Sequence, residues 1–256
     1  MFKQRMKVFS AGLAGTALVL LSGCSALTGG GDSDNGGDSS EGGFTDVTEQ
    51  VSSWDMCEVL PLDPIRDKAA ATTYAEGPNH VPMGTAFNAE AVGCRGEIEI
   101  PDTDGTTHWM QVHLSVFPGN SAEHVDDMWS MRQDGWYRDN VETNVEDLTA
   151  DDLVVDKDLD GAWDQAHAYA ILGTVGERSG AAGSMIVDAR TENYIVEAYL
   201  TIPTDAEKTA AARYGLSQEE IDARTALAFD RTELVNWVAD EYITTMFEAV
   251  SSQIES

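Results

Sequence analysis

One acidic stretch of the sequence has the residue types and spacing of a calcium-binding loop. Asp156, Asp158 and Asp160 stand at alternate positions and are followed by Gly161, so that the segment reads DKDLDG. In loops of the DxDxDG type, three carboxylates surround a Ca²⁺ ion at a sharp glycine turn, and further oxygens come from positions seven, nine and twelve. This spacing makes the three aspartates candidate Ca²⁺ ligands.

The second half of this loop fits calcium less well than the first. Asp164 stands at position nine and adds a fourth candidate ligand, but position twelve, where a bidentate Glu is usual, is His167. Because the sequence holds 45 acidic residues, such spacing also arises by chance. An acidic, solvent-exposed turn is therefore the alternative to a Ca²⁺ site, and no other cofactor is indicated.

The rest of the sequence holds no local motif for catalysis. None of the five histidines has the HExxH spacing of a zinc site, and neither GxSxG, GxGxxG nor a P-loop occurs. His108 and His113 are five residues apart on an expected strand, so they point to opposite faces. We therefore expect a protein that is not an enzyme, although catalytic residues distant in sequence leave no such motif.

The N-terminus has the pattern of an export signal. Three basic residues among the first seven precede an apolar segment from Val8 to Leu21, which is too short for a permanent membrane span. Leu21-Ser22-Gly23-Cys24 then resembles the lipobox of bacterial lipoproteins. The resemblance implies that Cys24 becomes the first residue of the mature chain and that its thiol carries diacylglycerol. An ordinary signal peptide with a coincidental cysteine is the alternative.

The sequence after Cys24 changes from apolar to Gly, Ser and Asp. Such a composition buries little apolar area, so we expect a flexible tether. The predicted organisation is a lipoprotein signal peptide over residues 1–23, the lipidated Cys24 and tether over 24–50, and a single domain over 51–256. The lipid on Cys24 would hold this domain at the extracytoplasmic face of the cell membrane.

The charge balance narrows the choice of partners. The chain carries 45 Asp and Glu against 15 Lys and Arg, a formal net charge of −30. A surface of this sign repels phosphate backbones, so we expect no nucleic-acid partner and consider cations and basic ligands favoured. An acidic surface that serves only solubility is the alternative.

The two remaining cysteines, Cys57 and Cys94, predict a disulfide bond, because paired cysteines in an exported chain are usually oxidised. Catalytic or metal-binding thiols are the alternative, but no CxxC spacing supports them.

Hydrophobic periodicity predicts an α+β fold, in which an antiparallel meander sheet of about five strands packs on a long C-terminal helix in two layers. The expected elements are a helix from Asp63 to Tyr74, strands over residues 97–100 and 108–117, a helix capped by Ser121, and strands over 167–175, 184–191 and 194–202. Capping boxes predict short helices over 204–213 and 217–229. The final helix is indicated by an apolar stripe of Leu234, Val238, Tyr242, Met246 and Val250.

The order of these elements resembles the small actinobacterial envelope lipoproteins that share a domain of unknown function. The resemblance rests on Cys57-Glu58-Val59-Leu60 ahead of a Pro-started helix, a second Cys before the first hairpin, the segment from Asp160 to His167, and the closing amphipathic helix. The family commonly has an aromatic residue two positions after the second Cys, where this chain has Gly96. It implies no catalytic residues.

Together these patterns predict a membrane-anchored, non-catalytic interaction module that binds an envelope protein or wall component. The alternative is a binder of a small ligand or cation in a cleft between sheet and helix. If the ligand is a cation, the four aspartates of the DxDxDG loop are its candidate ligands.

Overall fold

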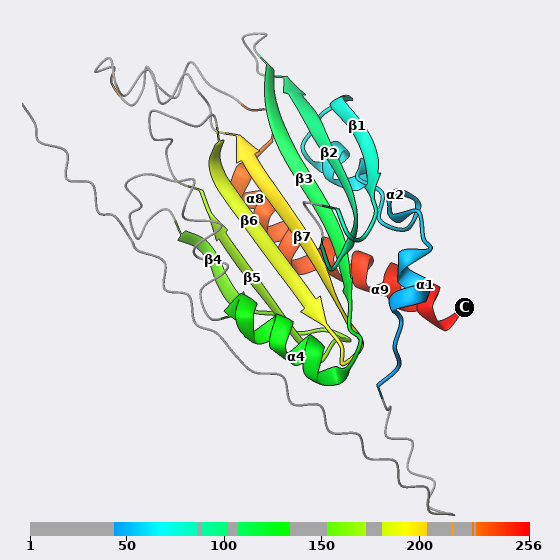
Figure 1. Cartoon of the computed structure of the whole chain (residues 1–256). Helices are drawn as coiled ribbons and strands as arrows, with labels where there is room; N and C mark the ends of the chain where they lie inside the picture. Colours follow the sequence, from blue (N-terminus) through cyan, green and yellow to red (C-terminus); the bar gives the residue numbers. More distant parts are fainter. Residues whose placement is uncertain are drawn as a thin grey trace, which may run out of the picture. The chain divides into compact units, whose positions relative to one another are not determined.

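Seven antiparallel strands form one sheet in the part of the chain that the computed structural model describes (Figure 1). That part comprises residues 44–85, 89–101, 107–133, 153–172, 181–203, 217, 227 and 229–256. The strands are β1 (Thr73–Val81), β2 (Val92–Pro101), β3 (Thr107–Pro118), β4 (Leu153–Asp158), β5 (Gln165–Ile171), β6 (Ala181–Arg190) and β7 (Tyr194–Pro203). The α+β class with an antiparallel sheet and a C-terminal helix is confirmed.

The strand order is β1-β2-β3-β7-β6-β5-β4, so the sheet is not the single five-strand meander that the sequence predicts. It consists of two runs of neighbouring strands, β1 to β3 and β4 to β7, which are joined where β3 pairs with β7. The prediction missed the two edge strands, β1 and β4. Edge strands are exposed on one side and often irregular, and both features weaken the alternating pattern on which the prediction depends.

The first edge strand, β1, begins within the helix that was expected to reach Tyr74 and continues through residues for which no regular element was expected. Helix α3 (Asp63–Lys68) ends early, and Ala70 adopts a left-handed backbone conformation with φ of 53°. Strand β1 then pairs with β2, with register shifts between Tyr74 and Asn79. Pro78 lies in this irregular stretch, where an edge strand tolerates the missing N–H.

The second edge strand, β4, lies within an acidic stretch that shows no strong period. Val155 is its one fully buried residue, and Lys157 contacts Asp240 on the C-terminal helix. A single buried side chain in six residues does not give the alternation by which a strand is predicted.

The C-terminal helix covers one face of the sheet, as the apolar stripe predicts (Figure 1). It consists of α8 (Arg231–Trp237), a π-helical turn η2 (Val238–Tyr242) and α9 (Ile243–Glu255). All five predicted stripe residues are buried, and they pack against alternate residues of the strands in one hydrophobic core. The tyrosine of the stripe, Tyr242, also donates a hydrogen bond from its hydroxyl to the carbonyl of Pro61.

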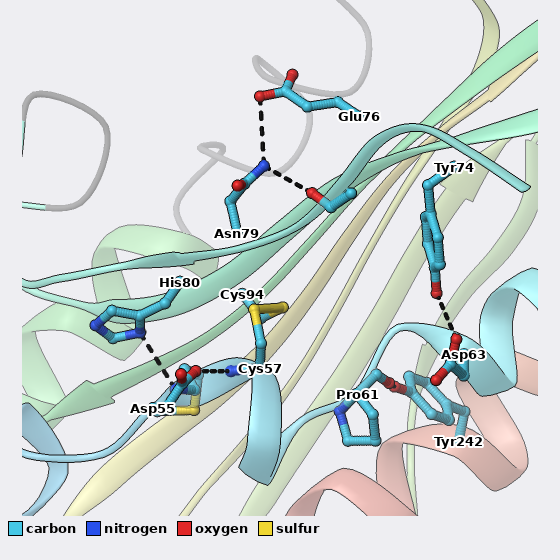
Figure 2. Close-up of a disulfide and its surroundings, with 12 residues drawn as sticks. Asp55, Cys57, Pro61, Asp63, Tyr74, Glu76, Asn79, His80, Cys94 and Tyr242 are labelled. Carbon is cyan, nitrogen blue, oxygen red and sulfur yellow. Dashed lines mark hydrogen bonds between the residues drawn. A yellow bond between two sulfur atoms is a disulfide. The ribbon is translucent and has the colours of Figure 1, made fainter.

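The short N-terminal helices α1 (Thr48–Ser52), α2 (Met56–Val59) and α3 contribute to the same core. The predicted Cys57–Cys94 disulfide is present and joins α2 to β2, with the two Cα atoms 4.8 Å apart (Figure 2). Beside it, the Asp55 side chain accepts a hydrogen bond from the Cys57 N–H, and His80 Nδ1 accepts one from the Met56 N–H. The disulfide thus fixes the N-terminal helices to the sheet.

Helix α4 (Ala122–Met131) lies on the opposite face of the sheet, so the fold has a third layer here and two layers elsewhere (Figure 1). The helix begins as predicted, with the Ser121 hydroxyl accepting a hydrogen bond from the His124 N–H. Its buried residues pack against Phe117 and Ile195. The turn before it requires glycine, because a Cβ at Gly119 would lie 2.2 Å from Val125 Cγ2.

The folded part includes residues that the sequence assigns to the tether. Val47 is 2% exposed and α1 begins at Thr48, so the expected boundary at residue 50 falls inside a helix. Cys24 and the expected signal peptide lie outside the described residues, as do the helices expected over 204–213 and, apart from isolated positions, 217–229. Among the described residues, no helix is both long and apolar enough to cross a membrane.

We predict that replacing both Cys57 and Cys94 by Ala lowers the free energy of unfolding by about 3–4 kcal/mol, because the disulfide closes a loop of 37 residues. Denaturant titration of the variant and the parent under oxidising conditions measures this difference. A variant as stable as the parent would show that packing alone holds α2 against β2.

Candidate functional site

A row of polar residues crosses the sheet on the face that bears α4. Because side chains alternate along each strand, residues paired across neighbouring strands share one face. The register aligns Asp158 of β4, His167 of β5, Asp188 of β6, Glu197 of β7 and Ser115 of β3. The row therefore brings together four titratable residues from the consecutive strands β4 to β7 and one serine from the more distant β3.

The centre of this row is a buried cluster of charges. Arg132, just after α4, places its Nη1 3.2 Å from Glu197 Oε2 and its Nε 3.5 Å from Asp188 Oδ2. The Asp188 side chain is 0% exposed and that of Glu197 is 8% exposed. The Arg132 guanidinium also lies over the Phe117 ring, 4.1 Å from its centroid. The cluster anchors the end of α4 on the sheet.

Two carboxylates share one guanidinium in this cluster, so the charges of the cluster do not cancel when both are ionised. The pKa of Glu197 reflects this. Burial raises the pKa of Glu197 to about 7 and outweighs the lowering effect of Arg132, while the Asp188 carboxylate adds a smaller increase. A proton on Glu197 leaves one carboxylate opposite one guanidinium. Paired carboxylates of this kind can exchange protons with a substrate, but these two are covered, so their contacts serve to hold α4.

The predicted calcium ligands lie at the outer end of the same row. Asp156 and Asp158 are on β4 and both contact His167, through Nε2 at 3.2 Å and Nδ1 at 3.0 Å. Asp160 and Asp164 lie in the loop between β4 and β5 instead. The predicted position-twelve residue thus contacts two of the four aspartates.

The loop that contains Asp160 and Asp164 is shaped by a tryptophan. Trp163 packs edge-to-face on Phe247 of α9, with ring centroids 5.5 Å apart, and its indole N–H donates to the Leu159 carbonyl. A Cβ at Gly161 would lie 2.3 Å from the Trp163 ring. The glycine of the DxDxDG pattern therefore makes room for an aromatic ring.

Within the described residues, no group of three or more His, Cys, Asp or Glu side chains is placed to hold a metal ion. The contacts of the loop account for its glycine and its hairpin shape without a bound cation.

A second polar surface, which the sequence analysis did not identify, lies on the same face of the sheet over β1, β2 and β3. Trp109 of β3 is 56% exposed. Glu99 of β2 lies directly across from it, and Glu97 lies across from Gln111. We call Trp109, Glu97, Glu99 and Gln111 the β2–β3 surface. An exposed Trp in a strand has no distinctive sequence pattern, so only the strand pairing reveals it.

A shallow depression of about 10 Å³ adjoins the β2–β3 surface, which is the space of about one water molecule. Val81, Gly93, Arg95, His113 and Ser115 are among its lining residues. His113 stacks edge-to-face with Tyr199, and burial together with the nearby Arg95 lowers the pKa of this imidazole. A neutral His in so small a depression suits an ordered water rather than an organic ligand.

Searches of protein-family models, curated proteins and solved structures find no match to this chain. The functional argument therefore rests on the geometry of the chain itself.

The buried charge cluster predicts a specific pH dependence of stability. Because burial raises the folded-state pKa of Glu197 above its ordinary value of 4.5, the folded state holds an additional proton between the two values. The stability that this proton contributes is present below pH 4.5 and is lost as the pH rises through about 7. Glu197→Gln, which stays neutral, should gain on the order of 2–3 kcal/mol relative to the parent between pH 5 and 8.

Denaturant unfolding across this pH range measures the difference. Glu248→Gln is the matched control, because Glu248 is an exposed carboxylate on α9 and its replacement removes the same charge from the acidic chain. Equal pH profiles for the two variants would contradict the assignment of the shifted proton to Glu197.

The geometry of the β4–β5 loop predicts no calcium-selective stabilisation. A single site at 100-fold excess of ligand would add about 2.7 kcal/mol, or on the order of 2–4 °C in Tm. We expect about 10 mM Ca²⁺ and Mg²⁺ to give equal and smaller shifts, because screening of an acidic surface does not depend on coordination geometry. A rise with Ca²⁺ alone that disappears in Asp158→Ala would establish a site at the four aspartates.

Proposed function

We propose that this chain is a lipid-anchored, extracytoplasmic interaction module that binds a protein of the cell envelope and performs no catalysis. The lipobox-like sequence ending at Cys24 supports the anchor. The observation that carries the binding role is the β2–β3 surface, where an exposed tryptophan lies beside two half-buried carboxylates on paired strands. Tryptophans in such positions dominate the energetics of protein interfaces.

The division of the sheet into a closed face and a partly open one supports this role. On the closed face, α8 to α9 and the N-terminal helices pack on alternate residues of the strands in a continuous core. On the other face, α4 covers residues of β3 and β7, including Phe117 and Ile195. The exposed Trp109 lies near the opposite end of β3 from Phe117, so it is accessible to a partner.

The position of the strongest acid–base candidates supports a non-catalytic role. Among the described residues, Asp188 and Glu197 are the carboxylates whose surroundings most resemble those of catalytic groups, because they are buried and adjacent. Their side chains contact Arg132 and are buried, so a substrate in solution does not reach them. Their contribution is to the docking of α4.

A binder of a small ligand or cation is the second candidate function, and the depression at Arg95 and His113 is the place in the described residues that bears on it, where the Arg95 guanidinium favours an anion over a cation. This depression lies on the open face of the sheet and not between sheet and helix. Its volume of about 10 Å³ suits a water or a small ion.

The anchor is tested by replacing the cysteine that would carry the lipid. We expect Cys24→Ala to leave the domain folded but to move it from the detergent phase to the aqueous phase, because the lipid is the source of membrane affinity. Phase partitioning of cell extracts with immunodetection measures the change. Retention of the variant in the detergent phase after cleavage of the signal peptide, with its mass verifying the cleavage, would refute the lipid anchor.

The binding role is tested by photo-crosslinking in intact cells. A photoreactive residue at Gln111, in the β2–β3 surface, should give discrete crosslinked products with another protein, whereas the same residue at Glu248 on α9 should not. Both positions are exposed, so the two variants differ chiefly in the face that they probe. Equal crosslinking from both positions, or none from Gln111, would contradict the assignment of this face.

A further inference from the structure

Trp109 is held in place by its strand but is not engaged by other side chains. It is 56% exposed, and within the described residues its indole makes no ring contact, cation–π contact or side-chain hydrogen bond. By contrast, Trp163 packs on Phe247 and Trp237 stacks on Tyr242. A flat aromatic face on a paired central strand costs little entropy when a partner covers it, because its backbone is already ordered.

The strands beside Trp109 carry an excess of negative charge. Glu97 lies directly across from Glu76 of β1 in the register, and like charges in that arrangement repel each other. Arg95 approaches Glu76 only to 3.9 Å. Glu99, directly across from Trp109, accepts a hydrogen bond from the Thr73 hydroxyl at 2.9 Å. The side chain of Glu97 has neither a hydrogen bond nor an ion pair to another described residue, so this side of the surface favours a cation.

An aromatic face beside carboxylates is suited to a planar cation. A guanidinium can stack on an indole ring while its N–H groups, which lie in the same plane, donate to neighbouring carboxylates. An ammonium group binds as a point charge and stacks less well. The arrangement of Trp109 with Glu97 and Glu99 therefore distinguishes arginine from lysine.

We infer that the β2–β3 surface binds an arginine-bearing basic segment of a partner protein, with a guanidinium between Trp109 and the carboxylates of Glu97 and Glu99. The inference rests on the proposed function and adds the chemistry of its partner. Charge complementarity selects this occupant, since the chain has a formal net charge of −30 and attracts basic proteins from a distance.

The test uses the full chain in detergent micelles and a labelled peptide of about twelve residues that alternates arginine with glycine. Fluorescence anisotropy gives the Kd at about 50 mM and 200 mM salt. We expect Trp109→Ala to weaken binding about tenfold, which is the loss of a desolvated cation–π contact, and Trp109→Phe to retain part of the affinity. Glu97→Gln and Glu99→Gln should each weaken binding about threefold and reduce its dependence on salt.

Two matched controls separate this surface from general attraction to an acidic protein. Met131→Ala removes an apolar side chain at the end of α4 that is 59% exposed, and Glu248→Gln removes one exposed charge from α9. Both should leave the Kd unchanged within twofold. A peptide with lysine in place of arginine should bind several-fold more weakly to the parent chain. Thermal unfolding of every variant verifies that the fold is intact.

Equal affinity of Trp109→Ala and Met131→Ala for the arginine peptide would overturn the inference, as would equal binding of the lysine and arginine peptides. Trp109-dependent binding of a wall-derived glycan fragment, without binding of the arginine peptide, would assign the surface to a carbohydrate and also overturn it. If crosslinking from Gln111 persists in either case, the interaction module stands and only the basic partner is refuted.

Discussion

The pairing of β3 with β7 is the constraint on which the rest of the structure depends. It aligns Gln111–Pro118 with Tyr194–Thr201 and joins two strand groups that would otherwise be separate sheets. One face of β3 supplies core residues such as Leu114, while the other carries Trp109 and Ser115. Because side chains alternate with a period of two, a slip of one residue would exchange the core with the polar face. A single register therefore determines both the stability of the fold and the composition of its binding surface.

The chain has few basic side chains, and several of them form ion pairs between different helices and strands. Lys68 of α3 pairs with Glu233 of α8, and Arg190 of β6 pairs with Asp126 of α4 while its guanidinium lies over Trp129. Exposed ion pairs contribute little individually, but they fix which elements meet. The buried Arg132 cluster does the same for the end of α4. These basic side chains thus lie at contacts between elements. The β2–β3 surface, with Glu97 and Glu99, has a negative charge.

Local signals in the sequence predicted the features that depend on neighbouring residues. The Ser121 cap and the apolar stripe ending at Val250 are of this kind, whereas the Cys57–Cys94 bond was predicted from the number of cysteines. The edge strands were missed because their burial does not alternate. The Arg132 cluster was missed for another reason: Arg132 reaches Asp188 and Glu197 only because the end of α4 packs on the β6–β7 hairpin, and no local pattern encodes that packing. Glu99 and Trp109 lie on one hairpin, β2–β3, but the alternation along a strand does not tell how exposed a given side chain of its polar face is. The glycine of the calcium-like spacing has a structural explanation, the Trp163 ring, that the spacing alone does not reveal.

Side-chain oxidation in intact cells tests the central claim, that the β2–β3 surface is where the chain meets its partner. Trp109 and Met131 are both more than half exposed, at 56% and 59%, and lie on different elements of the same domain. Hydroxyl-radical footprinting with mass spectrometry compares the oxidation of each between cells and the purified chain. The account predicts that Trp109 is protected in cells while Met131 is oxidised equally in both. Equal oxidation of Trp109 in cells and in the purified chain would contradict it.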